Sequence, residues 1–325
     1  MKKSSLILGV TGQDGSFLAK YLIKKGYIVH GLIRKSATGN LSNIKSILNN
    51  RLFKVHHGDL LDSSSLINVI KKLKPDEIYN FADQDHVKWS NELPNYSFMV
   101  TGASVVNLLE IIKNYSNKSK FFQAISSNIF GSSNKKKQTE NEVYKPLSIY
   151  ALGKVTAIHA CKMYRDVHGI NARGAIFYNH ESEIRPHEYV SRKITKAAAR
   201  ISLGKQKKLT LGDMSVKIDW GYAKDYVKAA HKIMQLKQND FFIIGTGKQH
   251  SIIDFVKKSF DYVNLDYKKY IKIDKRLYRK GKTSSLLADT RKAQKVFNFR
   301  TETSFEKLIS IMMDNDLEKE KIKSE

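Results

Sequence analysis

Short apolar stretches alternate with amphipathic stretches along the first half of the chain. The apolar stretches are rich in β-branched and aromatic residues and predict strands at 5–10, 28–33, 52–56, 77–82, 119–125 and 172–177. Between them, apolar residues recur with helical spacing and predict helices at 15–26, 41–49, 63–73, 98–114 and 149–168. Because strands that alternate with crossover helices pair in parallel, we expect an α/β fold with a doubly wound parallel Rossmann sheet.

The regular alternation fades past residue 178. The remaining pattern predicts helices near 187–203, 222–236, 251–263 and 303–314, separated by shorter mixed elements. We therefore expect residues 1–178 to form the sheet domain. Residues 179–316 would form a smaller mixed C-terminal lobe interleaved with it, and the charged tail 317–325 would fray.

The composition is that of a globular protein with an unusually basic surface. Hydrophobic residues make up 41% of the 325 residues, and 57 Lys and Arg against 31 Asp and Glu give a net charge of +26. The lysines are spread along the whole chain without an aromatic-interleaved basic module, so we interpret them as solvated faces and expect no nucleic-acid partner. No apolar run has the length of a membrane span and no cleaved signal pattern is present, which predicts no membrane association and a cytoplasmic location. The single cysteine, Cys161, is expected to be a buried structural thiol.

Three glycines follow the first predicted strand and precede the first helix. Gly9 permits a tight turn, Gly12 lets a pyrophosphate approach the backbone, and Gly15 lets the helix pack against the strand. The helix N-terminus then offers free N–H groups to phosphates. An ordinary glycine-rich turn would share the spacing, but the flanking strand and helix favour a dinucleotide site.

Tyr150 and Lys154 are four residues apart in a predicted helix, so both side chains leave the same face. A nearby ammonium stabilises a phenolate and would lower the tyrosine pKa toward neutral pH, which makes proton exchange with a sugar hydroxyl feasible. A solvated Tyr–Lys pair is the alternative. The predicted strand end at Ser126 and Ser127 favours the catalytic interpretation.

With these features the chain resembles the extended short-chain dehydrogenase/reductase superfamily, and within it the GDP-mannose 4,6-dehydratase family. Besides the glycine turn, the resemblance rests on Asn179-His-Glu-Ser182, Asp219-Trp-Gly221 and Ala223-Lys-Asp-Tyr226, which are far more specific than the glycines. It implies NADP as cofactor, a GDP-sugar substrate, GDP-mannose above others, and a homo-oligomer. Residues 1–178 would bind NADP and residues 179–316 the GDP-sugar.

The resemblance also implies roles for individual residues. Arg34 would pair with the 2′-phosphate of NADP, since no acidic residue that would grip an unphosphorylated ribose follows the second predicted strand. The cofactor-binding positions are Gly9, Val10, Thr11, Gly12, Gln13, Asp14, Gly15, Arg34, Asp59, Leu60, Phe81, Ala82, Asp83, Gln84, Asp85, Tyr96, Tyr150, Lys154, His180 and Arg185. The substrate-binding positions are Asn179, Val190, Lys193 and Arg279, and no metal is implied.

The catalytic positions implied are Ser126, Asn128, Tyr150 and Lys154. In the family's reaction, tyrosine takes the O4 proton as C4 is oxidised, a glutamate removes the C5 proton as water leaves from C6, and C6 is then reduced. Asn128 stands where that glutamate is expected, and an amide cannot accept the proton. Asp83 replaces a small residue and Asp85 a serine.

The departure at Asn128 leaves alternatives open. A nucleotide-sugar C4 oxidoreductase or epimerase needs Tyr150 and Lys154 but no C5 base. A low-activity NADP-binding paralogue needs neither step. A relocated carboxylate is a further possibility, and the candidates are Glu140, Glu142, Asp83 and Asp85.

Overall fold

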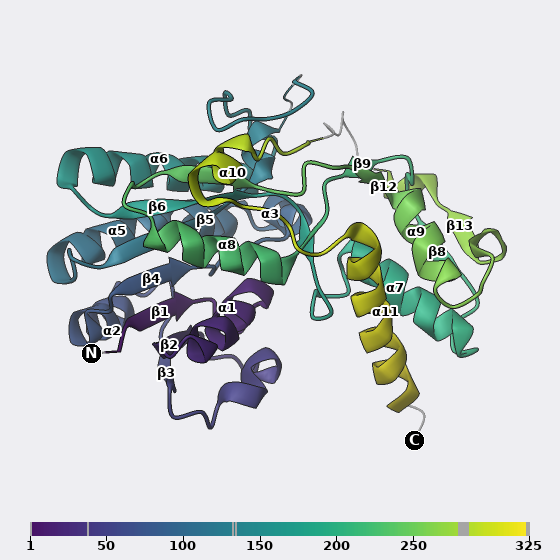
Figure 1. Ribbon diagram of the computed structural model, residues 1–325, viewed down its shortest axis with the longest axis horizontal. Helices are drawn as coiled ribbons and strands as arrows, with labels where there is room; N and C mark the ends of the chain where they lie inside the picture. The colour runs from purple at the N-terminus through teal and green to yellow at the C-terminus, as the bar shows by residue number, and fades with distance from the viewer. Residues whose placement is uncertain (1, 38, 132, 134, 279–285, 323–325) are drawn as a thin grey trace.

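A single parallel sheet forms the larger of two lobes in the computed structural model (Figure 1), which describes residues 2–37, 39–131, 133, 135–278 and 286–322. The sheet order is β3-β2-β1-β4-β5-β6-β11, and all neighbouring strands run parallel. The strands are β1 (Ser4–Leu8), β2 (Ile28–Ile33), β3 (Phe53–His57), β4 (Glu77–Asn80), β5 (Lys120–Ser126), β6 (Ala172–Phe177) and β11 (Phe241–Ile244). This order reverses between β1 and β4, which is where ligands bind in doubly wound sheets.

Helices cover both faces of the sheet, so the central strands are buried almost along their whole length, whereas the edge strand β3 is partly exposed. One face is covered by α2 (Ser63–Leu73), α5 (Ser104–Tyr115) and α6 (Ile149–His168). The other is covered by α1 (Gln13–Lys24) and α8 (Ala223–Gln235), with α10 (Arg291–Phe297) and the 3₁₀ turn η1 (Ser42–Ile47) beside them. Leu6 and Leu8 pack into the first layer and Ile7 into the second, as the alternation of a strand requires.

The smaller lobe has its own core around Trp220 and Phe255. Its helices are α7 (Val190–Ser202), α9 (Ile252–Asp261) and α11 (Phe305–Ile322), and its paired strands are β8 (Leu209–Leu211) with β13 (Ile271–Ile273) and β9 (Lys217–Ile218) with β12 (His250–Ser251). A further parallel pair, β7 (His180–Glu181) with β10 (Gly221–Tyr222), lies where the chain passes between the lobes.

Short helical segments complete the architecture. They are α3 (Val87–Glu92), α4 (Pro94–Phe98), the π-helical turn η2 (Met99–Ala103) and the 3₁₀ turns η3 (Ser127–Phe130), η4 (Tyr267–Lys269) and η5 (Lys275–Leu277). The turn η2 runs directly into α5, so one continuous helical stretch occupies most of the predicted 98–114 segment.

The six predicted strands and the predicted fold class are confirmed, but three expectations about smaller elements are wrong. The segment 41–49 is a 3₁₀ turn rather than an α-helix. The sheet has a seventh strand, β11, which the pattern did not reveal. The helix predicted at 222–236 is present as α8, but it covers the sheet instead of joining the smaller lobe.

The charged segment expected to fray from 317 continues α11 to Ile322. Asp316 forms a buried ion pair with Arg192 at 2.7 Å, and Glu320 accepts a hydrogen bond from Arg200 at 2.9 Å. Both arginines belong to α7. Glu320 within the segment, together with Asp316 just before it, therefore holds the last helix against α7.

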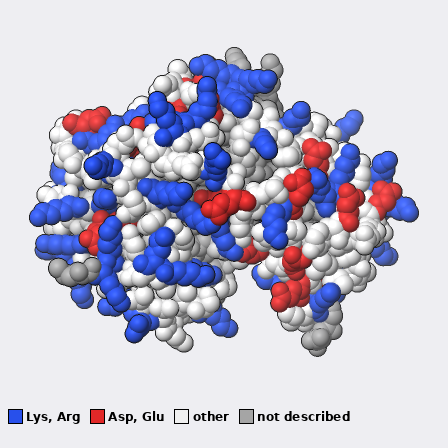
Figure 2. Space-filling view, in the orientation of Figure 1, with Lys and Arg blue, Asp and Glu red and all other residues white. Residues whose placement is uncertain are grey.

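Basic residues are spread widely over the molecule. Figure 2 shows lysine and arginine side chains scattered across both lobes, with acidic side chains between them. None of the helices in the described part of the chain combines the length and apolar character that crossing a membrane requires.

Candidate active site

The glycine turn after β1 forms a cradle in which side chains have no room. Gly9 has φ +78°, and a Cβ on it would lie 2.7 Å from the backbone nitrogen of Ala82. A Cβ on Gly15 would lie 2.2 Å from the carbonyl oxygen of Gly9. Helix α1 begins just after Gly12 without a side-chain cap, so its first N–H groups face the turn. These features fit the pyrophosphate of a dinucleotide.

A set of interactions connects this turn to the chain segment that enters the smaller lobe. His180 lies 2.8 Å from Asp14 through Nε2, and Gln13 donates to the carbonyl of His180 at 3.2 Å. Ser182 donates to the Gln13 side chain at 2.7 Å. We call Gln13, Asp14, His180 and Ser182 the inter-lobe latch. It joins two sequence motifs that are 166 residues apart.

The latch contains an ion pair. Burial alone would lower the pKa of His180, but the charge of Asp14 and its hydrogen bond raise that pKa overall. Burial would raise the pKa of Asp14, but the charge of His180 holds it below the ordinary value. Both shifts favour the charged forms, so the contact between His180 and Asp14 favours an ion pair over two neutral groups.

Of the other predicted cofactor residues, Arg34 and Tyr96 lie together, since Arg34 donates to the Tyr96 hydroxyl at 2.8 Å. The Asp59 carboxylate accepts the N–H of Leu61 in its own turn. Three predicted positions have core side chains: Val10 and Leu60 are buried, and the Phe81 ring stacks among Tyr79 and Phe177. Val10 and Leu60 are buried, so mainly their backbone is open to a cofactor, whereas the Phe81 ring is only partly buried.

Tyr150 and Lys154 project from the first turns of α6, one turn apart and almost completely buried. The helix starts where it does because Ser148 accepts the N–H of Ala151. The Lys154 ammonium is 5.7 Å from the centre of the Tyr150 ring and donates to the carbonyl of Ala124 at 2.8 Å. The sequence thus predicted this juxtaposition correctly.

Ser126 ends β5 beside this pair. Its hydroxyl accepts the backbone N–H of Asn128 at 3.2 Å and caps the turn η3. A hydrogen bond from Ser126 to Tyr150 favours the phenolate. We call Ser126, Asn128, Tyr150 and Lys154 the proton-transfer cluster.

The expected lowering of the tyrosine pKa is wrong. Burial and the charges of Asp83 and Asp85 raise the pKa of Tyr150 well above its ordinary value, against the smaller effect of Ser126. Burial is the largest cause, and the Lys154 ammonium, which was expected to lower this pKa, forms an ion pair with the buried Asp83 carboxylate instead. Asp83 also accepts the Thr101 hydroxyl at 2.6 Å, from the π-helical turn η2. Sequence reasoning identified Asp83 as a departure but did not find this pairing.

The other candidate carboxylates are engaged elsewhere. Glu140 accepts the N–H of Ile243 at 2.8 Å, and burial raises its pKa. Glu142 pairs with Lys135 at 3.0 Å. Asp85 is more than half exposed and lies 3.9 Å from Arg185. Among the four, only Asp83 contacts a member of the proton-transfer cluster.

The predicted substrate residues lie in and beside the smaller lobe. Asn179 is exposed and its carbonyl accepts the N–H of Gly221, Val190 begins α7, and the exposed Lys193 donates to the carbonyl of Thr210 at 2.9 Å. Arg279 lies outside the described residues. Arg185 stacks over the Tyr189 ring at 3.5 Å and pairs with Glu181 at 3.3 Å, so Tyr189, which the sequence analysis did not single out, lies against a predicted cofactor residue.

No metal centre is indicated by the described part of the chain, in which no three His, Cys, Asp or Glu residues are grouped to hold an ion. Cys161 is buried in α6, as predicted, and burial raises the pKa of its thiol.

Comparison with known proteins identifies the family of the chain. A sequence model of the family described as GDP-mannose 4,6 dehydratase matches residues 6–312. The chain belongs to the GDP-mannose 4,6-dehydratase family. It is 40% identical to GDP-mannose 4,6 dehydratase 2 of Arabidopsis thaliana over 327 aligned residues, which cover 98% of this chain and 87% of the relative. It is 35% identical to GDP-mannose 4,6 dehydratase of Homo sapiens, covering 97% of this chain and 91% of that one.

Solved structures show that the fold is shared more widely than this family. The dTDP-glucose 4,6-dehydratase of Bacillus anthracis in complex with NAD superimposes with a TM-score of 0.85 at 20% identity, covering 98% of both chains. The RMD protein of Pseudomonas aeruginosa complexed with NADPH gives 0.82 at 17% identity, covering 98% of this chain and all of that one.

The motifs that carry the family resemblance are largely structural here. Asp219 of the Asp-Trp-Gly motif is buried and accepts the N–H groups of Thr246, Gly247 and Ala288 at 2.8, 3.0 and 3.2 Å. Tyr226 stacks on His180 at 4.7 Å between ring centres. These motifs of the GDP-mannose 4,6-dehydratase family thus hold the loops and the latch in place.

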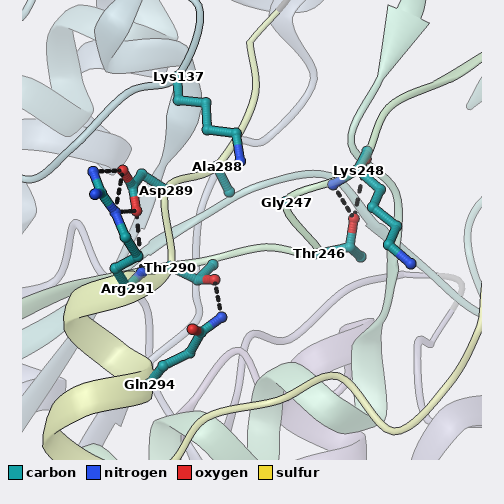
Figure 3. Close-up of a pocket in the computed structure, with 9 residues that line it drawn as sticks. All are labelled: Lys137, Thr246, Gly247, Lys248, Ala288, Asp289, Thr290, Arg291 and Gln294. Atoms are coloured by element: carbon teal, nitrogen blue, oxygen red, sulfur yellow. Dashed lines mark hydrogen bonds and ion pairs between the residues drawn. The ribbon is translucent and has the colours of Figure 1, made fainter.

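An open pocket of about 580 Å³ borders the loops that Asp219 holds (Figure 3). Lys137 and Lys248 come to it from separate loops, and Arg291 is paired with Asp289 at 2.6 Å. The lining residues are Lys137, Thr246, Gly247, Lys248, Ala288, Asp289, Thr290, Arg291 and Gln294. None of them is a predicted site residue, so this pocket is distinct from the proton-transfer cluster.

Proposed function

We propose that this chain is an NADP-dependent enzyme of the GDP-mannose 4,6-dehydratase type that oxidises GDP-mannose at C4 and eliminates water slowly. The observation that carries the proposal is the convergence of Ser126, Tyr150 and Lys154 at the sheet edge that also holds the glycine turn. The family membership supports the GDP-sugar as substrate.

In this proposal the chain's own residues bind the cofactor and move one proton. The glycine turn would receive the pyrophosphate and Arg34 would pair with the 2′-phosphate. Lys154 would lie beside the ribose. Ser126 orients the C4 hydroxyl, and the Tyr150 oxygen accepts its proton. NADP, when bound, accepts the hydride that leaves C4, so the carbinol is oxidised to a ketone.

Asn128 limits the next step. Removal of the C5 proton needs a base within hydrogen-bonding reach, and a carboxamide has no useful basicity at neutral pH. Its backbone is held by Ser126, at the position expected for the catalytic glutamate. This single residue favours a second candidate function, a nucleotide-sugar C4 oxidoreductase or epimerase that performs no dehydration.

Incubation with GDP-mannose and NADP⁺, followed by mass spectrometry and NADPH absorbance, separates these functions. Loss of one water mass supports the dehydratase. NADPH accumulation or a C4 epimer without water loss supports the second function. Unchanged sugar and cofactor, in a protein that binds NADP tightly, would contradict both and leave a binding paralogue.

Replacing the amide with the carboxylate that the reaction needs tests the limiting step directly. We expect Asn128→Glu to accelerate water loss by roughly 10²-fold or more, because a positioned general base contributes on that scale. Asn128→Gln is the matched control of equal length. If both variants eliminate water at the wild-type rate, Asn128 does not limit the reaction.

The preference for NADP over NAD is tested at Arg34. A charge-assisted pair with a phosphate contributes about 1.5–3 kcal/mol, so Arg34→Ala should weaken NADP binding by roughly tenfold or more and leave NAD binding unchanged. Calorimetric titration with each dinucleotide measures both. Equal losses for the two would assign Arg34 to another role.

A further inference from the structure

Lys154 of the proton-transfer cluster has one anionic partner, Asp83, and lies close to Tyr150, which would become a second anion on losing its proton. Its ammonium is buried, forms an ion pair with Asp83 and donates to the carbonyl of Ala124. A phenolate on Tyr150 would need the same positive charge, and the ammonium is 5.7 Å from the ring centre.

Asp83 is itself held firmly in this position. Its side chain is only 8% exposed. One carboxylate oxygen accepts the Thr101 hydroxyl at 2.6 Å and the N–H of Gln84 at 2.8 Å, and the other faces Lys154. Thr101 is presented by the π-helical turn η2, an irregularity of the kind often found at functional sites. The carboxylate is thus fixed from three directions.

The charged and titratable groups around Tyr150 are predominantly acidic. Asp83 and Asp85 follow β4, Tyr189 precedes α7, and Lys154 is the neighbour on α6. Arg185, the next cation, is stacked on Tyr189 and paired with Glu181. The pKa of Tyr150 is raised by burial first and by Asp83 next, which agrees with this arrangement.

We propose that Asp83 is a positioning residue that withdraws the Lys154 ammonium from the Tyr150 phenol, so that proton transfer from the sugar accelerates as the pH rises. Where the family has a small residue, the ammonium would be free to stabilise the phenolate. The kinetic consequence rests on the proposed function, whereas the ionisation of Tyr150 does not.

Ionisation is measured directly by NMR of protein labelled with ¹³Cζ-tyrosine, with Tyr150→Phe assigning the signal. In the wild type the Tyr150 signal should stay at its protonated position through about pH 10. In Asp83→Asn and in Asp83→Ala it should move to the phenolate position at lower pH. A wild-type signal that titrates together with those of the variants overturns the proposal.

Asp85→Asn is the matched control, because it removes the same charge from the same loop without touching Lys154. If the Asp83–Lys154 ion pair controls the ionisation of Tyr150, Asp85→Asn should shift the Tyr150 titration less than Asp83→Asn does. Equal shifts in the two variants would mean that any nearby negative charge has this effect, which contradicts the proposed role of the ion pair. Thermal unfolding identifies a variant that does not fold. If an Asp83 variant does not fold, Thr101→Val replaces it in the titration. This substitution removes the hydrogen bond from Thr101 to the Asp83 carboxylate and keeps every charge.

The kinetic arm follows NADPH formation from GDP-mannose against pH. Asp83→Asn should raise the rate at pH 7.5 by about tenfold and move the profile toward acid, since an opposite charge shifts such a titration by a unit or more. An unmoved profile contradicts the proposal. Absence of turnover in all variants contradicts the proposed function instead, and the NMR titration still decides the role of Asp83.

Discussion

The glycine turn and the proton-transfer cluster lie at the same edge of the sheet, yet they are specified in different ways. The turn consists of residues that are close in sequence, and its shape depends on the absence of side chains at Gly9, Gly12 and Gly15. The cluster brings together residues from β5, α6 and the loop after β4. The shape of the turn is therefore set by residues that are near in sequence. The charges around Tyr150 depend on residues that are distant in sequence, such as Asp83.

The largest expected effect is on the rate of sugar oxidation, and it comes from the proton-transfer cluster alone. Tyr150→Phe removes the proton acceptor and keeps the buried ring, so NADPH formation from GDP-mannose should fall by roughly 10²–10⁴-fold. NADP affinity should fall far less than the rate, because the glycine turn that would hold the pyrophosphate is unchanged. A Tyr150→Phe protein that oxidises the sugar at the wild-type rate would falsify the assignment of Tyr150.

A smaller effect is expected within the turn, where two glycines have different roles. Gly15→Ala places a Cβ 2.2 Å from the Gly9 carbonyl oxygen and should cost about 1–3 kcal/mol of unfolding free energy. Gly12→Ala has 3.3 Å to the same oxygen and should cost under about 1 kcal/mol, because Gly12 is the N-cap of α1, where glycine is preferred to alanine.

Gly12→Ala should nevertheless weaken NADP binding by about tenfold, because its methyl group stands where the pyrophosphate approaches. Urea unfolding and calorimetric titration with NADP measure the two quantities on the same samples. Equal stability losses in both variants, or an unchanged affinity in Gly12→Ala, would show that the turn is not a phosphate cradle.

The remaining effect concerns the inter-lobe latch and depends on pH. The Asp14–His180 pair should contribute about 1–3 kcal/mol to stability, measured as the coupling between Asp14→Asn and His180→Gln. The pKa of His180 is raised on folding, so its contribution is complete below the unfolded value of about 6.5 and is lost as pH rises through the folded value. The pKa of Asp14 is lowered, so its contribution is lost only in acid.

Urea unfolding of the double-mutant cycle at about pH 5.5 and about pH 9 tests this window. The coupling should be larger at the lower pH. A coupling that is equal at both values, or larger at the higher one, would mean that His180 is neutral in the latch.

Much of the architecture could be predicted from local patterns. Apolar runs predict the six strands. Helical spacing alone predicts that Tyr150 and Lys154 lie next to each other. By contrast, the four apolar residues of β11 carry too little pattern to reveal a sheet partner, because a lobe and a helix separate them from β6. The ordered end of α11 escaped prediction because a run of charges is normally solvated, and here Glu320 is buried and pairs with Arg200.

The amino-acid order alone determined the parallel sheet, the glycine turn, the tyrosine with its lysine, and the amide at 128, because each depends on residues near in the chain or on one residue's chemistry. The tertiary structure decided that Lys154 pairs with Asp83 and that Asp14 and His180 join the lobes. It also decided that Asp219 accepts backbone N–H groups such as that of Thr246. Electrostatic effects act through space over a few ångströms, so they appear only when distant segments are packed together.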